Sequence, residues 1–313
     1  MNHLIARISM VLSFSLVAEL ACAQEVFPNL DELRQVTASG VTVVRLTIDN
    51  DSLLLNRDDG FYTSGNQISL RKVLNTSEKS VIYGWQFGQD LYTASNINLI
   101  PEKISVVDHP YSGWLYAGVF REFADKTGTA SRIGLDIGCF GPCAGGERTQ
   151  KQLHRLLKQA LPQGWSSQLA QEWGAVLVGE WSPTRWAIAK NIDVQPRGKA
   201  RFGNIFTDAS IEASLRFGAL CDLPEQAANF GFLRGEVKTI GYDATIQGAY
   251  FNNQTLSVHP RRAVEEIELG YQWRSANYGL YASVIRRSSE IKELSNTLGA
   301  ENFVRLQFNY AIK

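Results

Sequence analysis

The strongest constraint on the fold is a strict alternation of residue types close to the end of the chain. Val304, Leu306, Phe308, Tyr310 and Ile312 are separated by single polar or small residues. A period of two is typical of a β-strand that has one apolar face and one polar face. The C-terminal segment is therefore predicted to be a strand.

Comparable segments recur along the chain, about twelve in all, each near the ten residues that a tilted strand needs to cross a bilayer. An even number of antiparallel strands can close into a barrel without free edges. We therefore expect an all-β fold, a transmembrane antiparallel β-barrel of about 12 strands. The segments are Val41–Asn50, Phe61–Leu74, Val81–Leu91, Gly113–Ala124, Arg132–Phe140, Gly174–Trp181, Trp186–Val194, Phe206–Ala219, Gly231–Gly241, Val264–Arg274, Tyr278–Arg287 and Phe303–Ile312.

Aromatic residues lie at or near the ends of several of these segments, as the girdles of a membrane barrel would. A soluble secreted β-sandwich that acts as a binding module is the alternative, and it would pack its apolar faces inward without girdles. The residues expected in the girdles are Trp85, Trp114, Trp173, Trp181, Trp186, Tyr242, Trp273 and Tyr278.

The N-terminus has the pattern of a secretory signal peptide. Arg7 precedes the apolar run Ile8–Ala18, and Ala21-Cys22-Ala23 is a small-x-small cleavage pattern. The apolar run is shorter than the roughly 20 residues of a spanning helix. We expect residues 1–23 to be removed and residues 24–313 to form a single domain. Cys22 raises lipidation as an alternative, which the preceding Glu19-Leu20 disfavours.

The charge balance argues against nucleic acid as a partner. Lys plus Arg and Asp plus Glu both number 31, whereas a nucleic-acid binder would carry a basic surplus. Of the remaining cysteines, Cys139 and Cys143 could close a small disulfide loop in an oxidising compartment, or could stay free thiols together with Cys221. No second close pair completes a zinc site.

One segment has helical rather than strand periodicity. Residues 147–161 place Leu153, Leu156, Leu157 and Ala160 on one helical face. Gly145-Gly146 precedes the segment and Pro162 follows it. We expect one short helix here, at the barrel mouth.

Two places could carry chemistry. His154 shares a face of the expected helix with Gln150, although a lone histidine is often a surface or packed residue. Asp49-Asn50-Asp51-Ser52 could hold a hard cation such as Ca²⁺ through oxygen ligands, or could be an ordinary polar hairpin loop. The chain has no Gly-x-Ser-x-Gly elbow, and Gly141–Glu147 lacks the lysine of a phosphate-binding loop.

Five motifs in order resemble the outer-membrane lipid A 3′-O-deacylase family. The resemblance is clearest between about residues 42 and 181 and continues beyond mainly as barrel pattern. The motifs are Asp49-Asn50-Asp51-Ser52, Gly60-Phe61-Tyr62-Thr63-Ser64-Gly65, Asp108-His109-Pro110-Tyr111-Ser112-Gly113-Trp114-Leu115, Gly141-Pro142-x-Ala144-Gly145-Gly146-Glu147 leading to Gln150 and His154, and Trp165 after the helix.

The resemblance implies an outer-membrane esterase that depends on Ca²⁺ and hydrolyses an ester-linked 3′-acyloxyacyl chain of lipid A. Asn50, Asp51, Thr63, Gln150 and His154 occupy the positions of the family's active-site residues. His154 would activate water, Asp51 and Asn50 would bind the metal, and Ca²⁺ would stabilise the oxyanion. The implied partners are lipopolysaccharide and other outer-membrane lipids, with the chain expected to be a monomer.

The chain departs from the family pattern at three positions. Leu99 stands where the best-known members have a lysine, with Lys103 nearby, and Ala160 stands where they have an acidic residue. The chain ends Ile312-Lys313 rather than in an aromatic residue. Alternatives that remain open are a phospholipid-directed acyl hydrolase and a non-enzymatic barrel, either a pore or a structural protein.

Overall fold

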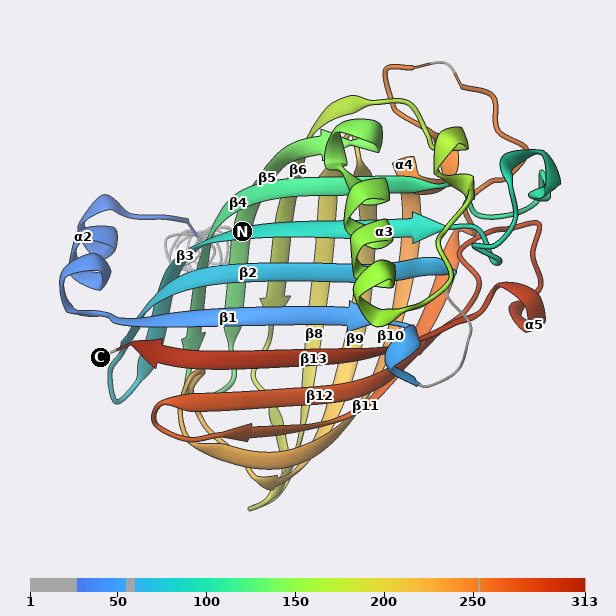
Figure 1. The fold of residues 1–313 in the computed structure, drawn as a ribbon. Helices are drawn as coiled ribbons and strands as arrows, with labels where there is room; N and C mark the ends of the chain where they lie inside the picture. Colours follow the sequence, from blue (N-terminus) through green and yellow to red (C-terminus); the bar gives the residue numbers. More distant parts are fainter. Residues whose placement is uncertain (1–26, 55–59, 253, 313) are drawn as a thin grey trace, which may run out of the picture.

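The computed structural model describes residues 27–54, 60–252 and 254–312 (Figure 1). The expected signal peptide, residues 1–23, lies outside these residues. The described chain is dominated by antiparallel strands. They are β1 (Val41–Asn50), β2 (Phe61–Asn75), β3 (Lys79–Thr93), β4 (Ser112–Asp125), β5 (Ala130–Phe140), β6 (Glu172–Ser182), β7 (Trp186–Ala189), β8 (Ile192–Gly203), β9 (Phe206–Ala219), β10 (Ala228–Asp243), β11 (Ala263–Arg274), β12 (Tyr278–Arg287) and β13 (Glu301–Ile312).

These strands close into the expected barrel. Strands that are consecutive in the chain pair with one another from β1 to β6 and from β8 to β13. β1 also pairs with β13, and pairing between β6 and β8 completes the ring. The closed wall therefore has 12 strands and β7 stands outside it. The Val304 to Ile312 segment pairs with β1 over Asn50 to Thr42 in continuous register.

One predicted strand is wrong. Trp186–Val194 is not a wall strand, because the chain turns at Lys190-Asn191 and pairs β7 back onto β8. The wall strand is Ile192–Gly203 instead. Its outward positions include Pro196, Gly198 and Ala200, so the apolar alternation is weak. Pro196 lies beyond the segment that pairs with β6, where a missing N–H is tolerated.

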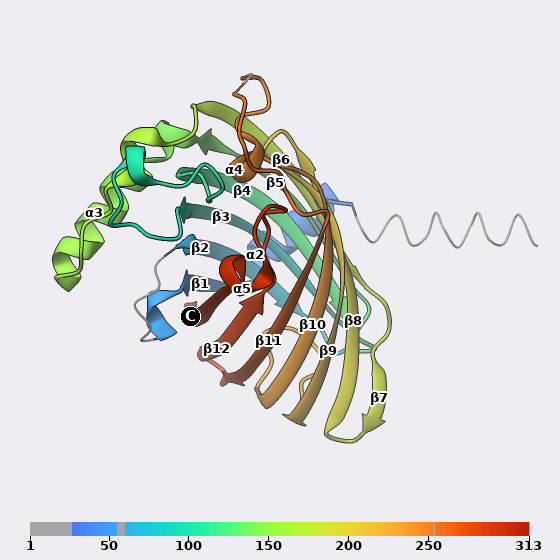
Figure 2. The same ribbon diagram turned by 90° about the vertical axis from the view of Figure 1, so that its right-hand side faces the viewer.

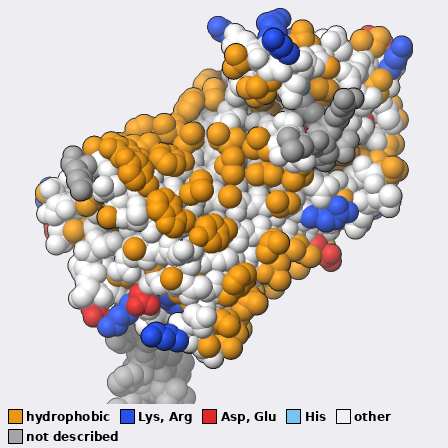
Figure 3. Space-filling view, turned by 60° about the horizontal axis from the view of Figure 1, so that its bottom comes forward, with side chains coloured by type: hydrophobic (Ala, Val, Ile, Leu, Met, Phe, Trp, Pro, Cys, Tyr) orange, Lys and Arg blue, Asp and Glu red, His pale blue; other side chains and the backbone are white. Residues whose placement is uncertain are grey.

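The outer surface of the wall is apolar. Exposed side chains such as Leu46, Phe87, Val119, Ile137 and Phe308 project from it. In Figure 3, apolar side chains cover much of the visible wall and charged side chains lie towards its ends. Trp85, Trp173, Trp181 and Trp186 are exposed as expected of girdles, whereas the structure buries Trp114, and its assignment to a girdle was wrong.

The two ends of the barrel differ in loop length. At one end lie the start of β1, the end of β13 and short turns such as 76–78 and 126–129, and at the other end lie the long connections 94–111 and 141–171. Outer-membrane-type barrels have short periplasmic turns and longer extracellular loops. The end with the long connections is called the rim below.

Helices are more numerous than expected. α3 spans Gly146–Leu157, and its last predicted turn is missing because Lys158 adopts a left-handed conformation that ends the helix. α3 stands outside the wall near the rim ends of β2 to β5, beside the mouth rather than across it (Figures 1 and 2). The other helical segments are α2 (Leu30–Ser39), α4 (Ala244–Gln247), α5 (Asn296–Gly299), and the short turns η1 (Ser52–Leu54), η2 (Pro101–Lys103), η3 (Gly141–Ala144) and η4 (Gly164–Ser167).

α2 lies at the end opposite the rim and packs on the outside of the wall. Val36 is buried against Val81 and Phe123. Glu32 accepts two hydrogen bonds from Arg121, at 2.7 and 2.9 Å. An arginine on the lipid-facing side of the wall is thereby neutralised.

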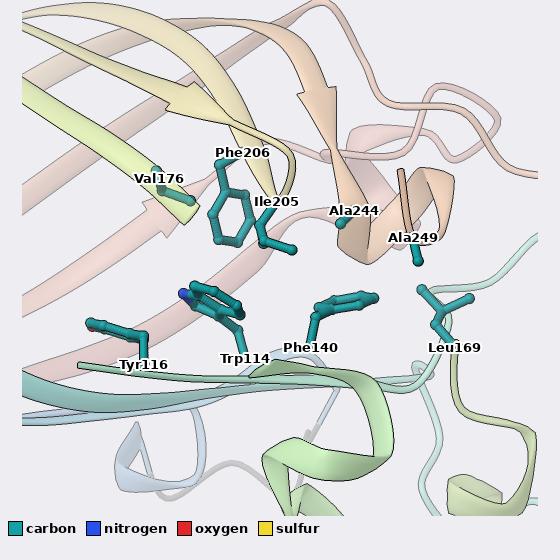
Figure 4. Close-up of a cluster of buried hydrophobic side chains, with 9 residues drawn as sticks. All are labelled: Trp114, Tyr116, Phe140, Leu169, Val176, Ile205, Phe206, Ala244 and Ala249. Atoms are coloured by element: carbon teal, nitrogen blue, oxygen red, sulfur yellow. The ribbon is translucent and has the colours of Figure 1, made fainter. Parts of the chain in front are cut away.

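Side chains fill much of the lumen. At the rim, Trp114 and Phe140 face Ile205, Phe206 and Ala244 in one apolar cluster (Figure 4). Towards the opposite end the lumen is crossed by ion pairs, one group of which joins Glu225 to arginines of β1, β2 and β11. Apolar side chains at the rim and charged side chains further along therefore lie across much of the lumen.

Two further observations complete the fold. Within the ranges described, no helix is both long and apolar enough to span a membrane. Cys139 and Cys143 form the small disulfide loop that was one of two possibilities, with Cα atoms 5.9 Å apart, while Cys221 is a free, half-buried thiol.

Candidate active site

The candidate residues lie on two parts of the chain, the rim ends of β1 and β2 and the helix α3, which stands outside the wall near the rim (Figures 1 and 2). Asn50 and Asp51 follow the end of β1, and Thr63 lies near the start of β2. Gln150 and His154 lie on α3. All of these except the half-buried Asn50 are buried. Both parts therefore lie near the rim of the barrel.

The strand-end group is held by short local contacts. Asn50 Nδ2 donates to the Thr63 carbonyl at 3.4 Å, and the Ser52 hydroxyl donates to Asn50 Oδ1. Asp51 Oδ2 accepts from the Gly60 backbone N–H at 2.9 Å. These contacts fix the direction of an amide oxygen and a carboxylate at the end of β1.

A β-bulge brings a further residue into this group. The register between β2 and β3 shifts between Tyr62 and Ser64, and the buried Thr63 and Thr93 hydroxyls lie 2.7 Å apart. Bulges re-aim a side chain at the edge of a site. Thr93 was not predicted from the sequence, because its contact with Thr63 depends on this shift in register and not on any local pattern.

His154 is oriented by the end of its own helix. Its Nδ1 lies 2.5 Å from the Ala160 carbonyl oxygen. A carbonyl only accepts, so Nδ1 carries the proton and the neutral ring has its lone pair on Nε2. The backbone carbonyl of Ala160 thus orients the imidazole. Ala160 itself stands where the best-known members of the family that the sequence resembles have an acidic side chain.

Gln150 is oriented by Trp165. The Trp165 indole N–H donates to Gln150 Oε1 at 2.7 Å, which assigns the other amide atom as a donor. That atom, Nε2, is buried and has no hydrogen-bond partner among the described residues. An unused buried donor is unfavourable unless a ligand satisfies it.

An apolar cluster connects the helix group to the wall. Trp165 packs with Leu91, Ala94 and Tyr111, and Gln89 Nε2 donates to the Ala144 carbonyl at 2.7 Å just before α3. Gly146 leaves no room for a side chain, since a Cβ atom would lie 2.6 Å from the Trp165 ring. α3 can therefore sit close against the wall.

The other histidines have different surroundings. His109 is buried, stacks on Tyr92 at a ring-centroid distance of 5.4 Å, and its Nδ1 lies 2.8 Å from the Pro110 carbonyl. Burial lowers the pKa of His109, which suits a neutral packed ring. His259 is exposed and contacts Glu293.

The position at which the family's lysine is missing lies in the loop between β3 and β4. Leu99 is half-buried, and Lys103 is exposed at the end of η2. Lys313, the last residue, lies outside the described ranges.

The oxygen atoms at the end of β1 have the chemistry that Ca²⁺ requires. Asp51 offers a carboxylate, Asn50 an amide oxygen, and Ser52 and Thr63 hydroxyls, all hard ligands. Nowhere in the part of the chain that the structure describes do three His, Cys, Asp or Glu side chains gather into a metal-binding group. A cation here would rely on amide, hydroxyl and carbonyl oxygens besides Asp51.

Comparison with known proteins identifies the family. The sequence pattern of the family described as "Outer membrane protein LpxR" matches residues 8–312. The chain belongs to the LpxR family. The resemblance to lipid A 3′-O-deacylases drawn from the sequence motifs is thereby confirmed, and the chain is an outer-membrane protein.

One solved structure supports the LpxR fold. LpxR from Salmonella typhimurium has 20% sequence identity and a TM-score of 0.71, over 86% of this chain and all of that one. The β domain of the Bordetella autotransporter BrkA has 12% identity and a TM-score of 0.48, over 88% of this chain and all of that one. A search of curated proteins finds no match.

Proposed function

We propose that this chain is an outer-membrane esterase that hydrolyses the ester-linked 3′-acyloxyacyl chain of lipid A. The observation that carries the proposal is the orientation of His154, whose Nδ1 contacts the Ala160 carbonyl, which assigns the basic lone pair of the neutral ring to Nε2. Membership of the LpxR family supports lipid A as the substrate. The chain would act as a monomer.

The reaction requires one proton to be moved twice. His154 Nε2 takes a proton from water as the water oxygen bonds to the ester carbonyl carbon. The bond between that carbon and the 3′ oxygen of the sugar then breaks, and the protonated imidazole returns the proton to the sugar oxygen. A base with a pKa near neutrality suits both transfers. The products are a free acyloxyacyl acid and a sugar hydroxyl.

The carbonyl oxygen gains negative charge during this reaction, and the site has a donor for it. Gln150 Nε2 is buried with its amide oriented by Trp165. Loss of one such donor in an acyl-transfer enzyme lowers kcat by about 10²–10³-fold. Gln150 is therefore assigned to stabilisation of the oxyanion.

Asn50 and Asp51 would hold Ca²⁺, with Thr63 and Ser52 as neighbouring oxygen donors. Bound Ca²⁺ supplies positive charge that polarises the ester carbonyl. Thr63 also fixes Asn50, because its carbonyl accepts from the Asn50 amide. The strand-end group would thus position the substrate ester opposite His154.

The test is mass spectrometry of lipid A from cells that express the wild type or His154→Ala. The wild type should release one acyloxyacyl group, and His154→Ala should leave lipid A intact while it still inserts in the membrane. Chelation of Ca²⁺ in isolated membranes should stop the wild-type reaction, and added Ca²⁺ should restore it. Unchanged lipid A in correctly inserted wild type with Ca²⁺ present would refute the proposal.

A further inference from the structure

The apolar face of α3 does not pack against the protein. Leu153, Leu156 and Leu157 are 39%, 78% and 54% exposed, whereas Gln150 and His154 are buried. A helix on a water-soluble protein buries its apolar face and exposes its polar one. α3 does the reverse, so its leucines require an apolar environment outside the protein.

The charged residues of α3 lie on another side. At about 100° per residue, Arg148 and Arg155 fall about 140–180° from Leu153 and Leu157 and about 80–100° from Leu156, and both arginines are exposed. A helix with leucines on one side and basic residues on the other is the form that lies in a membrane interface. The third side, with Gln150 and His154, faces the barrel.

The position of α3 fits such an interface. Both ribbon views place it outside the wall near the rim (Figures 1 and 2). The strands beside it continue into the lipid-facing band, with Phe87 on β3, Val119 on β4 and Ile137 on β5 exposed. The leucine face is therefore adjacent to a surface that acyl chains already cover.

We infer that the leucine face of α3 is inserted among the acyl chains of lipopolysaccharide in the outer leaflet. Arg148 and Arg155 would then lie at the level of the anionic lipid head groups, where basic residues are favoured. His154 and Gln150 are consequently held at the depth at which acyl chains join the sugar. The choice of lipopolysaccharide as occupant rests on the proposed function, whereas insertion of the helix rests on the exposed leucines.

Insertion can be measured without any reaction. A fluorescent label at Leu156→Cys, in a Cys221→Ser background, is compared with the same label at Arg148→Cys. The full barrel is placed in vesicles that contain lipopolysaccharide and lipids with a quencher on the acyl chain. The Leu156 position should be quenched several-fold more than the Arg148 position. Equal quenching at both positions would overturn the inference.

The occupant is tested by replacing lipopolysaccharide with phospholipid in the same vesicles. We expect the difference in quenching between the two positions to shrink when lipopolysaccharide is removed, because the basic side loses its preferred anionic partner. An unchanged difference would show that any acyl chains serve and would contradict the choice of lipopolysaccharide.

A kinetic measurement links insertion to substrate capture. Leu156→Asp should raise KM for vesicle-embedded substrate about tenfold, since burial of a leucine is lost, and leave kcat on detergent-dispersed substrate unchanged. Leu298→Asp, an exposed leucine on α5, is the matched control. If the helix inserts but the wild type does not deacylate lipid A, only the proposed function is refuted. If the wild type deacylates lipid A but Leu156→Asp does not change KM, only this inference is refuted.

Discussion

Glu225 is predicted to be a main stabilising residue at the periplasmic end of the barrel. It lies in the turn between β9 and β10, and its side chain is only 8% exposed. Its carboxylate contacts Arg45 and Arg274 at 2.8 Å and Arg71 at 3.7 Å. Three strands of the wall are thus joined through one carboxylate.

The magnitude follows from the two short contacts. A hydrogen bond to a charged group contributes about 1.5–3 kcal/mol, so loss of two suggests roughly 3–6 kcal/mol. A cavity of about 380 Å³ borders these residues, and water there can solvate the arginines left behind. We therefore expect Glu225→Gln to lower the free energy of unfolding by about 3 kcal/mol. Gln is preferred to Gly because Glu225 has a positive φ of 62°, which Gly would relieve.

The effect should depend on pH. Burial alone would raise the pKa of Glu225, but the charges of Arg45, Arg274 and Arg71 outweigh it and the pKa is lowered. A lowered folded-state pKa gives stability that is present above the unfolded value, about 4.3, and is lost as pH falls through the folded value. The difference between wild type and Glu225→Gln should therefore be full at neutral pH and shrink below about pH 4.

The assay is urea unfolding of the barrel in lipid vesicles, followed by tryptophan fluorescence. Glu78→Gln is the matched control, because Glu78 pairs with Lys126 in an exposed turn at the same end and should change stability by less than about 1 kcal/mol. Equal effects of the two substitutions, or a Glu225→Gln effect that does not change between pH 7 and pH 3, would refute the reasoning.

Two further substitutions test how helices are held against the wall. Gly146→Ala should lower kcat about tenfold or more with little loss of stability, since its Cβ would displace Trp165 and with it the Gln150 amide. Gly179→Ala, with open space around the glycine, is the control for the deacylation assay. Equal activity of the two variants would contradict the assigned role of Gln150. Glu32→Ala should destabilise the barrel by about 2 kcal/mol in urea unfolding, because Arg121 loses two hydrogen bonds. Asp31→Ala, at an exposed position, is the control. An equal change in both variants would contradict the neutralisation of Arg121 by α2.

Most of the wall could be predicted from the sequence because alternation is a local property. β13 and β1 have strong apolar positions at every second residue and were predicted with nearly the right ends. β8 was missed because its lipid-facing side presents Pro196, Gly198 and Ala200. Small residues are tolerated at lipid-facing positions, but they do not produce the apolar alternation from which a strand is predicted.

The site could be predicted only in part, and for a different reason. The resemblance supplied Asn50, Asp51, Thr63, Gln150 and His154, and in the structure both segments that carry them lie near the rim. The contacts that orient them were not readable, because the Ala160 carbonyl reaches His154 only through the left-handed turn at Lys158. Likewise, the leucine pattern correctly predicted a helix and did not reveal that the leucines would be exposed.

The most direct test of the proposed reaction uses purified barrel, lipid A and Ca²⁺ in water enriched in ¹⁸O. Water attack at the ester carbonyl predicts one ¹⁸O atom in the carboxyl group of the released acyloxyacyl acid, and none in the sugar hydroxyl. His154→Ala should release no acid above background. Release of unlabelled acid, transfer of the acyl chain to another lipid, or full activity of His154→Ala would contradict a reaction in which His154 activates water.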